Sequence, residues 1–175
     1  WGVTRHADVL DVERRSATFV SGRGYRSWWV PEENSIIAMD DPDHAEQRRL
    51  VSNRFTPKAV RTHEEFFRTT IDELLDAVAA QDTTEVVEHL AAPLPCRLTA
   101  RLLGFPEERW RDVKVWSERL MRIDMAERDE TTFVELYGTI TEFVGLLAEV
   151  APERQACPAD DLLSVWGHAP CGDGE

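Results

Sequence analysis

The stretch MDDPDHAEQRRLVSNRFTP, residues 39–57, decides how this sequence is interpreted. Pro42 suits the first turn of a helix, Asp41 can cap that turn, and Asp43 favours the positive end of the helix dipole. The pattern predicts a helix that starts at Pro42 and runs to about residue 55. The Thr-Pro pair at 56–57 then ends this helix and can start the next one.

One face of this helix combines hydrogen-bond donors with apolar side chains. At about 100° per residue, that face holds His44, Arg48, Val51 and Phe55. If it faces the interior, Arg48 needs an anion, because an unpaired buried charge is strongly destabilising. The anion is either a carboxylate of the protein or the carboxylate or phosphate of a bound ligand. An arginine that simply lies at the surface is the third possibility, and the spacing alone leaves all three open.

The rest of the chain is predicted to be mainly α-helical. Apolar residues recur at helical spacing in four further stretches, 67–78, 86–102, 110–120 and 133–147. Pro93 and Pro95 predict kinks, and Gly104 predicts a helix end. Pro152 is expected to close the last long helix, and Asp161 is able to cap a short helix after it.

Composition narrows the class of protein. The chain has 175 residues, 42% of them apolar, so it is able to bury a core and is expected to form one domain. Its net charge of −13 disfavours binding to nucleic acid. No apolar run reaches the roughly 18 residues of a membrane span, and the charged first ten residues are unlike a signal peptide. Three cysteines without metal-ligand spacing favour a cytoplasmic location.

Residues 39–57 closely resemble the C-helix segment of bacterial cytochrome P450 enzymes. The pattern Asp-Pro-x-His-x-x-x-Arg-Arg, followed by Phe-Thr-Pro, stands here as Asp41-Pro42-Asp43-His44, Arg48-Arg49 and Phe55-Thr56-Pro57. Three more segments resemble the family in the same order. Residues 3–9 are similar to its strand and B helix, 92–106 to its E helix and the turn into F, and 160–164 to its H helix. The resemblance implies a partial cytochrome P450 fold over residues 1–175, a single partial domain with the B to H helices.

This resemblance also implies a cofactor and residues that touch it. In the family the C-helix His and Arg hydrogen-bond a propionate of haem b, so these roles fall to His44 and Arg48. Ile37 stands where the family places an apolar contact near the haem. The implied substrate contacts are Trp28, Trp29 and Ile36 in the long loop before the helix, and Leu120 and Met121 at the end of the F helix. Equally, these apolar side chains could be packing residues.

The parts of the family that carry out the chemistry have no counterpart in this sequence. The oxygen-activating I helix, the K helix and the loop Phe-x-x-Gly-x-x-x-Cys-x-Gly with the iron ligand are missing. Cys96, Cys157 and Cys171 lack the glycine and aromatic frame of that loop. No residue of this chain is therefore expected to be catalytic or to ligate metal. The iron ligand is expected outside the segment, and the segment alone is expected to be inactive.

The implied parent enzyme is a monooxygenase that inserts one oxygen atom from O₂ into a small apolar substrate. Its implied electron donor is a ferredoxin or a flavoprotein, and Arg49, which points off the haem face of the helix, could meet that donor. A solvated arginine is the alternative. Two other interpretations stay open: a non-catalytic helical ligand-binding or regulatory domain in which His44 and Arg48 hold a carboxylate, and a family member that has lost its catalytic half.

Overall fold

The computed structural model describes residues 2–24, 35–122 and 129–169. These ranges contain helices and connecting turns and no β-strand, so the mainly α prediction is confirmed. The strand that the resemblance implied at the start is wrong, because residues 2–5 form no ladder with another segment. The chain divides into two compact units, residues 1–54 and 55–175. The single partial domain stays a prediction.

Three helical elements lie entirely within the described part of the first unit. They are α1 (His6–Arg14), the 3₁₀ turn η1 (Ile36–Ala38) and α2 (Asp43–Ser52), which contacts η1. The predicted helix of residues 42–55 is shorter than expected: after Ser52 the chain continues as the 3₁₀ turn η2 (Asn53–Phe55). A 3₁₀ turn advances by about 120° per residue, so Phe55 does not continue the α-helical face of His44 and Arg48.

The second unit begins with a capped helix, as the Thr-Pro pair predicts. Thr56 Oγ1 accepts a hydrogen bond from the N–H of Ala59, and α3 (Pro57–Arg61) follows. A break at His63 separates α3 from α4 (Glu64–Ala79). The π-helix η3 (Val87–Ala91) then leads into α5 (Pro93–Leu103), so the predicted proline kink is a π-helical turn. Prolines lack the N–H that an α-helical turn would use there.

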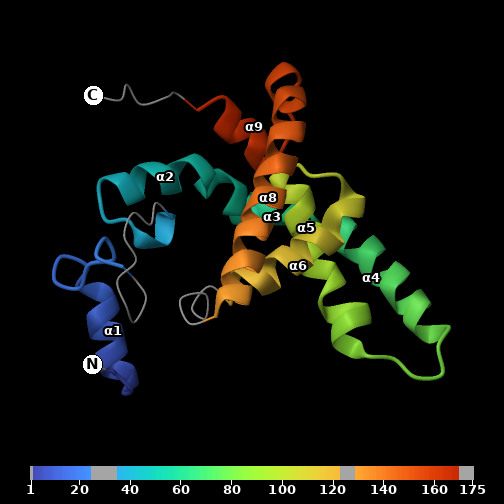
Figure 1. Cartoon of the computed structure of the whole chain (residues 1–175), viewed down its shortest axis with the longest axis horizontal. Helices are drawn as coiled ribbons and strands as arrows, with labels where there is room; N and C mark the ends of the chain where they lie inside the picture. Colours follow the sequence, from blue (N-terminus) through green and yellow to red (C-terminus); the bar gives the residue numbers. More distant parts are fainter. Residues whose placement is uncertain (1, 25–34, 123–128, 170–175) are drawn as a thin grey trace. The chain divides into compact units, whose positions relative to one another are not determined.

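The core of this unit lies where α5, α6 (Trp110–Leu120), α8 (Glu130–Ala156) and α9 (Leu162–Gly167) meet, with η4 (Glu107–Arg109) preceding α6. Figure 1 shows α6 and α9 lying against α8, and these pairs are in contact. Phe105, Trp116 and Phe143 pack edge-to-face with ring centres 5.6 to 6.3 Å apart. Gly104, in the left-handed region with φ +89°, ends α5 as predicted.

Pro152 does not close α8, contrary to the prediction. The helix continues to Ala156 with Pro152 inside it. The last turn is held by tertiary contacts: Val150 is buried in the core, and Arg154 reaches both Asp161 and the carbonyl of Gly104. These contacts outweigh the one hydrogen bond that the proline removes. None of the helices described is long and apolar enough to cross a membrane.

Candidate functional site

The two predicted donors lie one turn apart on α2. The side chain of His44 is 37% exposed, and its Nδ1 lies 3.4 Å from Oδ1 of Asp41. Arg48 is exposed, and within the described ranges its guanidinium has no hydrogen bond or ion pair. Spacing of i and i+4 places both side chains on one side of the helix. Among the described residues, the pair is therefore open to a bound anion.

A hollow of about 190 Å³ in the first unit brings three predicted residues together. Ile36, Ile37 and His44 all line it, although Ile36 and Ile37 are neighbours on η1 and His44 lies on α2. Ile37 is 59% exposed, so most of its apolar surface is open to a ligand. The remaining lining residues are Ser16, Phe19, Ser21, Met39, Asp40 and Asp41.

Asp40 holds this hollow together. Its Oδ1 accepts a hydrogen bond from the N–H of Ser21 and its Oδ2 one from the N–H of Gly22, each 2.8 Å long. We call these two bonds the Asp40 clamp. A Cβ atom on Gly22 would lie 2.6 Å from Oδ2 of Asp40, so the close approach requires glycine. The backbone carbonyl of Asp40 also accepts a hydrogen bond from the N–H of His44, at 2.9 Å.

Sequence reasoning missed the Asp40 clamp and assigned the cap to the wrong residue. Asp41 was expected to cap α2, but the N-cap position is Pro42, and no side chain caps the helix. The carboxylate of Asp41 faces His44 instead. The neighbouring Asp40 carried one signal, since it is an acidic residue before a helix start. Its bonding partners lie 18 and 19 residues earlier, beyond the reach of local patterns.

The structure describes only some of the predicted substrate contacts. Trp28 and Trp29 lie outside the described residues. Ile36 lines the hollow of the first unit. Leu120, at the end of α6, and Met121, just after it, belong to the second unit and are 39% and 79% exposed.

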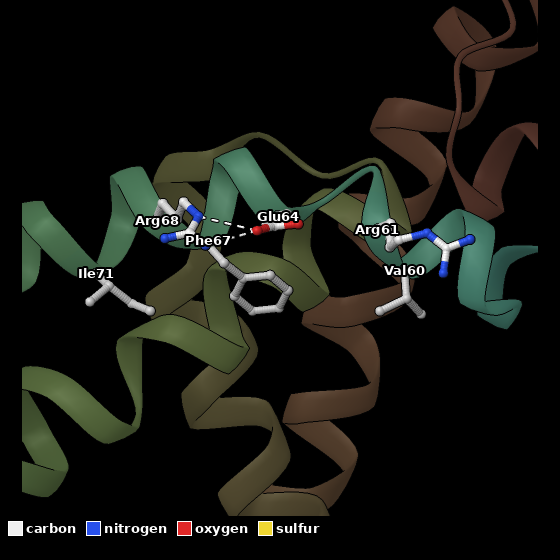
Figure 2. Close-up of a pocket in the computed structure, with 6 residues that line it drawn as sticks. All are labelled: Val60, Arg61, Glu64, Phe67, Arg68 and Ile71. Carbon is white, nitrogen blue, oxygen red and sulfur yellow. Dashed lines mark hydrogen bonds and ion pairs between the residues drawn. The ribbon is translucent and has the colours of Figure 1, made fainter.

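A second hollow, of about 420 Å³, lies on α3 and α4 and contains no predicted site residue. Figure 2 shows Phe67 between Val60 and Ile71, with the Glu64–Arg68 ion pair beside it. The guanidinium of Arg61 has no partner among the residues that the structure describes. The sequence predicts the apolar stripe of residues 67–78 on one helix, but not a groove beside it.

Along the sequence, positive charge is concentrated in the stretch that starts on the donor helix. Between Glu46 and Glu64 the sequence has five basic residues and no acidic one, in a chain of net charge −13. They are Arg48, Arg49, Arg54, Lys58 and Arg61. A run of like charge of this kind favours acidic partners.

One of the two described cysteines is poorly suited to bind iron as a thiolate. Cys96 is half-buried on α5, and burial raises the pKa of its thiol. Cys157 is exposed at the C-terminal end of α8, and Cys171 lies outside the described residues. In the described ranges no group of three or more His, Cys, Asp or Glu side chains is arranged to hold a metal ion.

Among known proteins, this chain is similar to cytochrome P450 enzymes and monooxygenases. The chain matches no protein-family model. It is 31% identical to cytochrome P450 130 of Mycobacterium tuberculosis over 170 residues, covering 93% of this chain and 41% of the relative. It is 35% identical to a steroid C26-monooxygenase of Mycolicibacterium smegmatis over 163 residues, covering 93% and 40%. The chain thus spans about two fifths of the length of these relatives.

A solved structure matches the whole chain. The cytochrome P450 CYP268A2 of Mycobacterium marinum, in complex with pseudoionone, superposes with a TM-score of 0.86 at 31% identity. The match covers 100% of this chain and 44% of that structure. The predicted resemblance and the predicted partial fold are both confirmed. The chain has a partial cytochrome P450 fold, and its sequence resembles the N-terminal portion of the bacterial cytochrome P450 family.

Proposed function

We propose that residues 1–175 supply the propionate contacts and part of the substrate pocket of a bacterial haem-thiolate monooxygenase. The observation that carries the proposal is the donor pair on α2. His44 lines a hollow, and Arg48 has no partner in the described ranges. This donor set suits a carboxylate, because a guanidinium binds it through two parallel hydrogen bonds and an imidazole adds a third. The haem, when bound, supplies the activation of O₂.

Each contact residue has a distinct part in this proposal. Arg48 neutralises a propionate of haem b. Asp41 lies beside Nδ1 of His44, so the other ring nitrogen is the one that serves the ligand. Ile37 offers apolar surface to the ring. The iron takes a cysteine ligand from outside these residues. A relative named for a steroid and a similar structure in complex with pseudoionone support a small apolar substrate. Its proposed contacts are Trp28, Trp29, Ile36, Leu120 and Met121.

The absorbance spectrum of the protein encoded by the complete open reading frame tests this function. The reduced protein with carbon monoxide should show the strongly red-shifted Soret band of a thiolate-bound haem. Haem with an ordinary Soret band would contradict the thiolate ligand. Protein purified without haem, and unable to take up added haem, would overturn the proposal in favour of a helical ligand-binding domain.

Substitution of the donors tests the propionate contacts separately. Arg48→Ala and His44→Ala should each speed the loss of haem about tenfold, which corresponds to one charge-assisted hydrogen bond. Arg14→Ala is a matched control, because Arg14 is an exposed arginine of α1 outside the hollow. Rates of haem loss equal to that of the control would show that neither donor touches a propionate.

The electron donor is proposed to be an acidic ferredoxin or flavoprotein of the cytoplasm that docks at Arg49 on α2. Arg49 is exposed on α2 and has no partner among the described residues. Arg49→Glu should slow reduction by the native donor at low salt, and the effect should shrink as salt screens the charges. An unchanged rate at low salt would exclude Arg49 from the docking surface.

A further inference from the structure

The Asp40 clamp and His44 are linked through one turn of backbone. The same residue that binds Ser21 and Gly22 through its carboxylate accepts the N–H of His44 through its carbonyl. The clamped loop also contributes Phe19 to the hollow that His44 lines. Opening the clamp would therefore remove one wall beside the imidazole and free the turn from which it projects.

We propose that Asp40 is a positioning residue for the haem propionate. Its clamp holds the loop against the entry of α2 and fixes the orientation of His44. This inference rests on the proposed function, because it needs a propionate at His44 and Arg48. It adds a residue that does not itself touch the cofactor.

Haem and its dimethyl ester, which lacks the two propionate charges, together provide the test. The complete protein is reconstituted with either form, and transfer to apomyoglobin gives the rate of dissociation. The wild type should lose the ester about tenfold faster than haem, and Asp40→Ala should reduce this ratio by roughly threefold or more. A merely structural defect would speed the loss of both forms equally and leave the ratio unchanged.

Gly22→Ala is an independent variant that keeps every charge. Its Cβ would displace the Asp40 carboxylate, so it should lower the ratio as Asp40→Ala does. The double variant should do no more than either alone, because both open the same clamp. Asp43→Ala is the matched control, since it removes an equal charge from the first turn of α2 without touching Ser21 or Gly22.

The outcomes separate this inference from the proposed function. A wild-type ratio near one would overturn the propionate contact itself, and the inference with it. A large wild-type ratio that collapses in Arg48→Ala but persists in both Asp40→Ala and Gly22→Ala would overturn the inference alone. A lowered ratio in Gly22→Ala supports it even if Asp40→Ala fails to fold.

Discussion

A single carboxylate, that of Asp161, joins three segments of the second unit. Its Oδ1 accepts the N–H of Ser164 and so caps α9, as the sequence predicts. Its Oδ2 lies 2.6 Å from Nε of Arg154 on α8, and Nη2 of Arg154 donates to the carbonyl of Gly104. The carboxylate is almost fully buried, and its hydrogen bond to Arg154 raises the pKa of that guanidinium.

Removing this carboxylate should destabilise the protein substantially. Asp161→Ala is expected to cost about 3 kcal/mol in the free energy of unfolding, because it leaves the charge of Arg154 without its buried partner. Urea unfolding measures the change. Glu153→Ala is the control: Glu153 also pairs with Arg154 but is exposed, so its loss should cost about 0.5 kcal/mol or less. Equal effects of the two substitutions would contradict the role of burial.

Two glycines of this unit should respond oppositely to alanine. Gly104→Ala is expected to cost about 2 kcal/mol or more. Its φ is +89°, and a Cβ there would lie 2.5 Å from Oδ2 of Asp161. Gly138 lies inside α8 with nothing within 4 Å of an added Cβ, so Gly138→Ala should gain about 0.5–1 kcal/mol. Thermal unfolding of both variants checks the signs, and a neutral Gly104→Ala would disprove the clash.

Among the helices, capping and helix-ending residues predict most starts and ends from the local sequence. Where these predictions are wrong, contacts between residues far apart in the sequence are the reason. The cap at Thr56 and the helix end at Gly104 depend on residues within a few positions of each other, so the sequence reveals them. The passage of α8 through Pro152 depends on Arg154 reaching a carbonyl 50 residues away. Such a contact has no local pattern.

The candidate site likewise combines a local feature that the sequence predicts with a long-range contact that it does not. The donor pair on α2 follows from spacing within one helix, together with the resemblance to a family. The Asp40 clamp joins the residues before α2 to a loop 18 residues earlier, and no periodic pattern of apolar residues predicts it. The Glu46–Glu64 interval without acidic residues was visible in the sequence and became informative only beside a donor helix.

His63, at the start of α4, should make the free energy of unfolding depend on pH. Burial, followed by the charge of Arg101, lowers the pKa of His63 from its usual value of 6.5. The unfolded chain therefore binds a proton at His63 more readily than the folded chain does. The contribution of neutral His63 to the free energy of unfolding is complete above pH 6.5. It is lost as the pH falls below that value toward the lowered pKa.

Replacing His63 should remove this part of the pH dependence. His63→Gln is expected to lose less stability than the wild type between pH 7 and pH 5, measured as the melting temperature at each pH. His6→Gln, at the exposed start of α1, should follow the wild-type curve. A wild-type slope that His63→Gln leaves unchanged would assign the dependence to other groups.

Across the whole molecule, large apolar side chains remain exposed. On α8 they recur at i, i+4, i+7 and i+11, with exposed fractions of 45% to 68%: Phe133, Tyr137, Ile140 and Val144. The groove on α3 and α4 adds a second apolar surface (Figure 2). Contiguous apolar surface of this kind favours association. The relatives are more than twice as long as this chain.

The exposed face of α8 should be detectable in residues 1–175 expressed alone. The segment is expected to bind an apolar fluorescent dye and to aggregate as its concentration rises. Tyr137→Lys with Val144→Lys should reduce both effects with little change in helix content, because both side chains are exposed. Asp8→Lys is a control that changes charge on α1 instead. Dye binding that both variants leave unchanged would place the apolar surface elsewhere.

Activity should be absent from the same segment. Residues 1–175 with haem, O₂ and an electron donor are expected to show no oxygenase turnover above that of free haem, because the proposed iron ligand lies outside them. Product analysis by mass spectrometry measures this. Robust turnover by the segment would contradict the proposed division of labour between this region and the rest of the parent enzyme.

The close approach of Gly104 to Asp161 links three positions in any lineage that keeps this fold. The left-handed φ of +89° disfavours every side chain at 104, whatever residue stands at 161. The charges at 154 and 161 are expected to be lost together, because removal of either one leaves the other buried without its partner. A library that randomises all three positions should therefore retain glycine at 104, and either both charges or neither at 154 and 161.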